Sequence, residues 1–164
     1  MKRKVYIAGP HLFSTDYAIF SRAIAQKCNK TQITPVFPGD DRARTPQDIY
    51  TGNLDLIRQC DGVIADLNPF RSEIEPDSGT SMECGFAAAS GIPIVGIVED
   101  QHSLLHKMRA SSLGCNEFGG VYRSDEGDHI ENFNLPLNLM LFHALETLAS
   151  TMDEAIHYFD HKTW

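Results

Sequence analysis

The sequence predicts an α/β fold, a doubly wound parallel sheet of about five strands with helices on both faces, and three observations support this. Four short runs rich in β-branched and apolar residues lie in the first hundred residues, at 4–9, 33–37, 62–67 and 92–98. Segments with helical periodicity separate them. No linker or repeat interrupts the 164 residues, so we expect one domain over residues 1–164. Strands alternating with helices form βαβ units, in a Rossmann-like or flavodoxin-like layout.

Three helices are expected between and around these strands. The first covers 16–28, where apolar residues recur on one stripe. The second covers 45–60 and opens with a Thr-Pro pair that suits the N-cap and the first helical position. The third covers 80–90 and ends before Gly91, a residue suited to the left-handed conformation after a helix.

The chain after the fourth strand is harder to assign. A short helix is expected near 103–110 and a strand around 119–123, followed by an acidic segment at 124–131 that reads as a lid or, more simply, a solvated insertion. Apolar residues then recur with helical period over 141–159, which predicts one long helix covering the sheet.

Composition narrows the classes of partner. The formal net charge of −8 argues against nucleic acid and against an anionic membrane, whereas uncharged nucleosides and bases remain open. The four cysteines are widely spaced and predict reduced thiols, and the start of the chain reads as a strand, so a cytoplasmic location is expected. The sequence contains neither G-x-G-x-x-G nor a Walker A lysine motif, and the two His-x-x-x-His pairs lack a carboxylate motif. We therefore expect no cofactor and no metal.

The stretch DSGTSMECGFAAASG at 77–91 leaves the role of Glu83 open. Thr80 and Glu83 have the spacing of a capping box, in which the glutamate only satisfies backbone N–H groups. The same carboxylate at a helix start could instead be a nucleophile kept ionised by the helix dipole. Gly79 and Gly85 in this segment suggest that the helix packs tightly against a ligand or another backbone.

Ligands of open parallel sheets bind beyond the carboxyl ends of the strands, so we place the site at the loops that follow the first and third strands and at the top of the 45–60 helix. Glu83 would attack an anomeric carbon, and Asp77 would handle the proton of the leaving group. Tyr6 is either a core tyrosine or a group that orients the carboxylate. Asn53 is equally a self-satisfied core residue or a ligand contact, and Asp55 points either to solvent or to the cleft.

Several blocks of this sequence resemble the nucleoside 2-deoxyribosyltransferases. They are YIAGPHLF at 6–13, the Asn53–Asp55 helix, CDGVIADLNP at 60–69, DSGTSMECGFAAASGIPI at 77–94 and PLNLM at 136–140. The order of the blocks agrees with that family, and the combination is specific where a single block would be weak. The segment between the fourth strand and PLNLM is longer than the family pattern, which leaves the fifth strand and the subunit arrangement unassigned.

The resemblance implies a flavodoxin-like enzyme that exchanges the base of a 2′-deoxynucleoside by double displacement, with 2′-deoxynucleosides and free nucleobases as its substrates. Glu83 matches the nucleophile, Tyr6 the tyrosine that positions it, and Asp77 the acid that helps to protonate the base. Asn53 matches a base-contacting position. Asn138 and Met140 match residues that a neighbouring subunit lends to the site, which implies at least a homodimer. The remaining residues of these blocks expected to contact substrate are Gly9, Phe13, Asp55 and Gly79.

Two other functions fit the same sequence. The first is a hydrolase of 2′-deoxynucleoside 5′-monophosphates, an N-glycosidase that would use the same glutamate but would need anion-binding groups for the phosphate. The second is a non-catalytic nucleoside-sensing module, which would need no ionised glutamate. We predict that Glu83 turns away from the helix cap and into the cleft.

Overall fold

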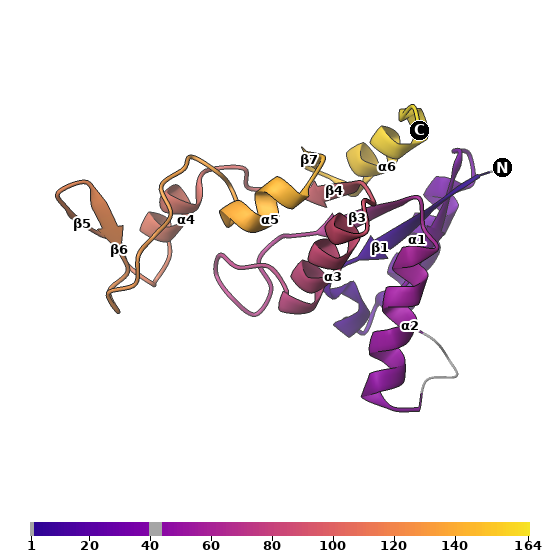
Figure 1. Cartoon of the computed structure of the whole chain (residues 1–164), viewed down its shortest axis with the longest axis horizontal. Helices are drawn as coiled ribbons and strands as arrows, with labels where there is room; N and C mark the ends of the chain where they lie inside the picture. The colour runs from indigo at the N-terminus through magenta and orange to yellow at the C-terminus, as the bar shows by residue number, and fades with distance from the viewer. Residues whose placement is uncertain (1, 40–43) are drawn as a thin grey trace.

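The computed structural model describes residues 2–39 and 44–164 and contains a five-stranded parallel sheet (Figure 1). The strand order is β2-β1-β3-β4-β7, which is the flavodoxin-like order. The strands are β1 (Arg3–Ala8), β2 (Ile33–Val36), β3 (Gly62–Asp66), β4 (Ile94–Ile97) and β7 (Thr147–Ala149). The first four lie within or next to the predicted runs, so the fold class and these strands are confirmed.

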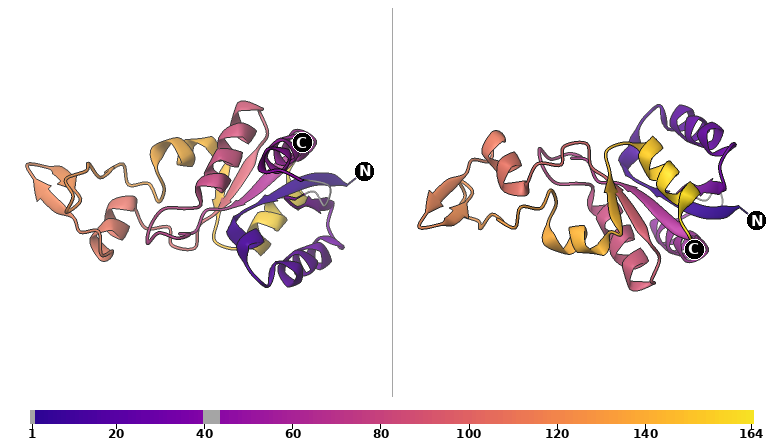
Figure 2. Two further views of the ribbon diagram at one scale, coloured as in Figure 1. Left: turned by 90° about the horizontal axis from the view of Figure 1, so that it is seen from below. Right: turned by 90° about the horizontal axis from the view of Figure 1, so that it is seen from above.

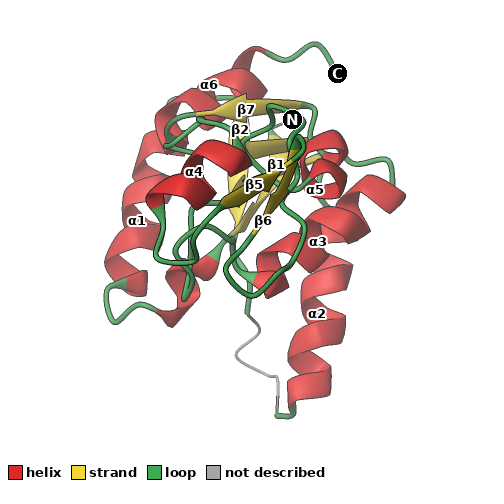
Figure 3. Cartoon of the chain, turned by 90° about the vertical axis from the view of Figure 1, so that its left-hand side faces the viewer, coloured by secondary structure: helices red, strands yellow, loops and turns green. Residues whose placement is uncertain are grey.

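Helices cover both faces of the sheet (Figure 3). One face carries α1 (Tyr17–Cys28) and α6 (Met152–His161), and the other carries α2 (Pro46–Arg58), α3 (Ser78–Ala89) and α5 (Leu139–Ala144). The helices expected at 16–28, 45–60 and 80–90 therefore form, and Gly91 has the left-handed φ of +70° predicted after the third. None of the described helices is long and apolar enough to cross a membrane.

The alternation of side chains along β1 decides which residues reach which face. Val5 and Ile7 pack in the core beneath α1 and α6, whereas Tyr6 and Ala8 pack in the core beneath α2 and α3. Successive residues of a strand point to opposite faces, so this division follows from the strand geometry. It places the Tyr6 ring on the same face of the sheet as α3.

The single long helix expected over 141–159 is wrong. The chain forms α5, then the fifth strand β7, then α6. α6 begins afresh at Thr151, whose hydroxyl accepts from the Glu154 N–H at 3.2 Å while the Glu154 carboxylate accepts from the Ser150 N–H at 2.7 Å. This T-x-x-E pattern marks the start of a new helix at 151–154, but the apolar stripe that runs through it favoured one continuous helix. A three-residue strand is too short to reveal its own period of two.

Residues 104–135, which we call the arm, extend away from the sheet, as both views in Figure 2 show. The arm contains α4 (Leu104–Ala110) and the antiparallel hairpin β5 (Asn116–Phe118) and β6 (Val121–Arg123). Gly119 and Gly120 join the two strands with φ of +60° and +84°, the two left-handed positions of a type I′ turn. The helix and strand predicted near 103–110 and 119–123 are thus confirmed, and β5 was not foreseen.

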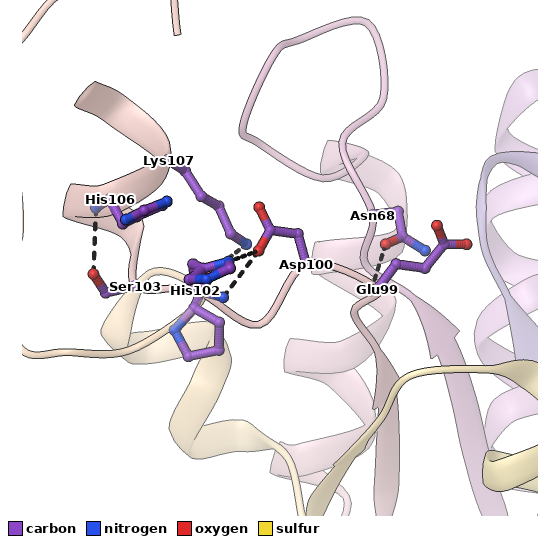
Figure 4. A network of polar contacts seen from close by, with 8 residues as sticks. Asn68, Glu99, Asp100, His102, Ser103, His106 and Lys107 are labelled. Carbon is purple, nitrogen blue, oxygen red and sulfur yellow. Dashed lines mark hydrogen bonds and ion pairs between the residues drawn. The ribbon is translucent and has the colours of Figure 1, made fainter. Parts of the chain in front are cut away.

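The base of the arm is held by a buried lysine. Lys107 extends from α4 toward the loop after β4 (Figure 4), and its ammonium donates to the Pro136 carbonyl at 2.8 Å. Its side chain is among the few charged ones that are buried in the described chain. A second contact, from the Leu104 N–H to the Leu135 carbonyl at 2.7 Å, joins the two ends of the arm. These contacts connect α4 to the chain that leads into α5.

Candidate functional site

The centre of the site is a hydrogen bond between two side chains from different elements. The Tyr6 hydroxyl, on the fully buried ring in β1, donates to Glu83 Oε1 in α3 at 2.7 Å. Glu83 itself is half-buried. A strand tyrosine and a helix glutamate 77 residues apart are brought together because both lie on the α2/α3 face of the sheet.

Glu83 does not cap its own helix. The N-cap of α3 is Asp77, whose Oδ2 accepts from the Thr80 N–H at 2.8 Å and from the Thr80 hydroxyl at 3.0 Å. Thr80 is therefore inside the first turn, and Glu83 lies one turn further on. The capping-box alternative for Thr80 and Glu83 is wrong, and the prediction that Glu83 turns away from the cap is confirmed. That Glu83 turns into a cleft stays a prediction.

The electrostatic surroundings of Glu83 oppose its ionisation. Burial, the largest influence, raises its pKa to about 7; the negative charge of Asp77 acts in the same direction, and the Tyr6 hydrogen bond partly offsets both. Burial, followed by the neighbouring charge of Glu83, raises the pKa of Tyr6, so that the phenol stays protonated and remains a donor. Glu83 is thus a carboxylate that gains or loses its proton near neutral pH.

The glycines near the site differ in what surrounds them. A Cβ on Gly79 would lie 3.0 Å from Asp77 Oδ2, and one on Gly9 would lie 3.0 Å from the Asp66 Cβ, so a side chain at either position would crowd its neighbour. Gly85 is exposed, and a Cβ there would meet nothing within 4 Å. Gly79 therefore packs against the N-cap side chain of its own helix and not against another backbone. No other part of the described chain approaches Gly85, where contact with a ligand stays a prediction.

The two polar residues of α2 have different settings. Asn53 is half-buried, and its Oδ1 accepts from the Gly39 N–H at 3.1 Å, which ties α2 to the loop after β2. Asp55 is exposed and pairs with Arg58 one turn along, at 2.8 Å. Of the two alternatives for Asp55, the structure shows the solvent-facing one. The two alternatives for Asn53 were a core residue bonded within the chain and a ligand contact. Its oxygen is bonded within the chain, while its partly exposed side chain leaves a ligand contact open.

Asn138 and Met140 lie at the start of α5. Asn138 is the N-cap, and its Oδ1 accepts from the Met140 N–H at 3.0 Å. Its amide nitrogen donates to Glu131 at 2.6 Å. The Met140 side chain is 74% exposed, so most of its apolar surface contacts nothing in this chain.

A second cluster lies at the carboxyl ends of β1 and β3, where the site was expected; its members other than Phe13 were not among the predicted site residues. Phe13 ends the 3₁₀ turn Pro10–Phe13 and stacks on Phe70 with ring centroids 5.7 Å apart, and the Arg71 guanidinium lies against both rings. Nearby, His11 Nε2 lies 2.8 Å from the buried Asp66. These side chains, apart from Asp66, border an open hollow of about 400 Å³. An aspartate directly after a buried apolar strand was the signal that could have revealed this pair.

The described residues contain no group of three or more potential ligands that could hold a metal ion. The rings of His102 and His106 stack on each other, with centroids 4.4 Å apart, and His102 Nδ1 lies 2.7 Å from Asp100 (Figure 4). His157 and His161 likewise pack ring to ring. The i, i+4 spacing of both histidine pairs is accounted for by these contacts.

Together, the fold and the site define a flavodoxin-like α/β protein in which a buried strand tyrosine is hydrogen-bonded to a half-buried helix glutamate on one face of the sheet. Comparison with known proteins agrees with this class. The sequence model of the nucleoside 2-deoxyribosyltransferase family matches residues 5–140. The chain therefore belongs to the nucleoside 2-deoxyribosyltransferase family.

Among solved structures, a 2-desoxiribosyltransferase from Leishmania mexicana is similar over 98% of this chain and 99% of that one, with a TM-score of 0.79 and 32% identity. A conserved protein from Enterococcus faecalis V583 shares the fold, with a TM-score of 0.63, 21% identity and coverage of 97% and 98%. An uncharacterized protein of Schizosaccharomyces pombe is 30% identical over 115 residues, which are 65% of this chain. That alignment spans about half, 54%, of the yeast protein.

Proposed function

We propose that this protein is a nucleoside 2-deoxyribosyltransferase that exchanges the base of a 2′-deoxynucleoside through a glutamyl-deoxyribosyl ester. The observation that carries the proposal is the Tyr6–Glu83 hydrogen bond, because it fixes the orientation of the carboxylate of a half-buried glutamate. Family membership and the similarity to the Leishmania mexicana structure support it. The reaction needs no cofactor.

In the first half-reaction, a Glu83 oxygen attacks C1′ of the deoxynucleoside. The C1′–O bond forms, the C1′–N bond breaks, and the base leaves with the electron pair of that bond. Asp77 helps to protonate the departing base by relaying a proton taken from solvent, and its Oδ1 is suited to this because Oδ2 accepts the bonds from Thr80. In the second half-reaction, a nitrogen of the incoming base attacks C1′ and releases the Glu83 carboxylate. Two inversions give net retention.

The other residues bind the substrate in this proposal. Tyr6 orients the Glu83 carboxylate through its hydrogen bond, and Asn53 contacts the base. Asn138 and Met140 bind the sugar end of the substrate in a neighbouring subunit. The exposure of Met140 is consistent with its contacting the substrate of a neighbouring subunit. Gly9, Phe13 and Gly79 shape the mouth of the site. Asp55 has less support, since it pairs with Arg58.

Two features of the setting complete the proposal. The protein acts as a homo-oligomer, at least a dimer, whose subunits complete one another's sites. It works on small uncharged nucleosides and free bases rather than on nucleic acid or at a membrane, and we place it in the cytoplasm.

The test is an incubation of the protein with a 2′-deoxynucleoside and a different free base, followed by chromatography. We expect a new deoxynucleoside to form and Glu83→Ala to abolish it. Asp153→Asn, which removes an exposed carboxylate from α6 on the opposite face of the sheet, is the matched control and should leave the exchange rate unchanged. Release of free deoxyribose without exchange would indicate a hydrolase, and absence of turnover would favour a sensing module.

A further inference from the structure

The start of α5 is bound by a carboxylate from the acidic segment. Glu131 Oε1 accepts from the Asn138 amide nitrogen at 2.6 Å, and Glu131 Oε2 accepts from the Leu139 N–H at 2.9 Å. Asn138 in turn accepts from the Met140 N–H at 3.0 Å. The first two N–H groups after the N-cap are therefore both occupied, and the orientation of the Asn138 amide is set by Glu131.

This arrangement is unfavourable for a phosphate. Phosphates in proteins are held by free backbone N–H groups at helix starts and by Arg or Lys side chains. Here a phosphate that approached Asn138 would have to displace the Glu131 carboxylate or lie beside it. A neutral hydroxyl has no such conflict, because the Asn138 oxygen keeps a second lone pair and its nitrogen a second hydrogen.

The charges around Asn138 are also unfavourable for a phosphate. Asn138 borders a hollow of about 460 Å³ at the junction of the arm with the sheet domain. None of the described residues that line it is Lys or Arg, and five of them are carboxylates: Glu75, Asp125, Glu126, Asp128 and Glu131. These carboxylates influence one another, since burial and then the negative charge of Glu131 raise the pKa of Glu75. A 5′-phosphate carries close to two negative charges and would meet like charge there.

We propose that Glu131 is a specificity-determining residue that makes the site select nucleosides with a free 5′-hydroxyl and reject their 5′-monophosphates. The inference rests on the proposed function, in which Asn138 binds the sugar end of the substrate. It also gives a role to the acidic segment 124–131. Glu131 acts by occupying the donors that a phosphate needs and by orienting Asn138 for a hydroxyl, while the neighbouring carboxylates add repulsion.

The experiment measures binding without turnover. In a Glu83→Gln background, isothermal titration calorimetry gives the dissociation constants of a 2′-deoxynucleoside and of its 5′-monophosphate. We expect the monophosphate to bind at least about tenfold more weakly, and Glu131→Gln to narrow that ratio by about tenfold. Glu117→Gln is the matched control, since it removes one charge from the arm outside the hollow and should leave the ratio unchanged.

A second measurement needs no substitution at Glu131. Like-charge repulsion is screened by salt, so raising the salt concentration should narrow the nucleoside-to-monophosphate ratio of the Glu83→Gln protein. The inference would be overturned if Glu131→Gln left the ratio of the two dissociation constants unchanged. Tighter binding of the monophosphate than of the nucleoside by the Glu83→Gln protein would overturn it too. Because binding is measured without chemistry, a failure of base exchange in the wild-type protein would refute the proposed function separately.

Discussion

At the residue scale, Glu83 must be ionised to act as a nucleophile, yet it is held where ionisation is opposed. The Tyr6 hydroxyl favours the charged form, whereas burial and Asp77 disfavour it, and the result is a pKa of about 7. A carboxylate that is poorly solvated is a stronger nucleophile than one in water, and a pKa near neutrality keeps a substantial fraction of it ionised. The rate of exchange should therefore follow the protonation state of Glu83.

The pH profile and a Tyr6 variant test this. We expect kcat/KM for base exchange to rise with pH through about 7, because only the ionised Glu83 attacks. Tyr6→Phe removes the one hydrogen bond that lowers the Glu83 pKa, so the rising limb should move to higher pH. At pH 7 the variant should lose about tenfold or more in kcat/KM, given the usual strength of a hydrogen bond to a charged group. An unchanged limb in Tyr6→Phe would contradict the assigned coupling.

At the element scale, two glycines of the same chain should respond to alanine in opposite ways. A Cβ at Gly62 in β3 would lie 2.5 Å from the Phe159 ring of α6, whereas one at Gly85 in α3 would meet open space. We expect Gly62→Ala to lower the free energy of unfolding by about 1–3 kcal/mol through overpacking. Gly85→Ala should raise it by about 1 kcal/mol. Denaturant unfolding measures both, and equal effects would show that α6 does not pack on β3 as described.

The elements also show what sequence patterns can reveal. The first four strands and three helices were predictable because each is long and has a clear period or a marked end. β7 was not, because its three residues continue the apolar stripe of the flanking helices. In the site, Glu83 could be found from its segment, but the N-cap at Asp77 and the hold of Glu131 on Asn138 could not. Both depend on contacts formed only after the chain has folded.

At the scale of the whole molecule, the exposed apolar surface of the arm supports the proposed homo-oligomer. A two-stranded hairpin is marginally stable alone, and this one extends from the sheet domain (Figure 1). Large apolar side chains along the arm and the chain after it are exposed: Leu113, Phe118, Val121, Phe133 and Met140. A second copy of the chain would cover them and would bring Met140 and Asn138 to a neighbouring site. This is the physical basis for the proposed homo-oligomer.

Sedimentation of the purified protein tests the assembly. We expect a dimer or a larger oligomer, and we expect Phe133→Asp to shift it toward monomer and to reduce base exchange in parallel, since burying a charge in an interface is costly. Ile19→Asp is the control, because Ile19 is 62% exposed on α1, outside the arm. A monomeric wild-type protein with full exchange activity would contradict the shared site.

The central claim is that Glu83 becomes covalently linked to the sugar, and the most direct test is to trap that ester. The enzyme would be incubated with a 2′-deoxynucleoside and no acceptor base, quenched in acid, digested and mapped by mass spectrometry. We predict that the peptide containing Glu83 gains the mass of one deoxyribosyl group, and that Glu83→Gln shows no adduct and no exchange. Base exchange that persists in Glu83→Gln, or an adduct on a different residue, would contradict the account.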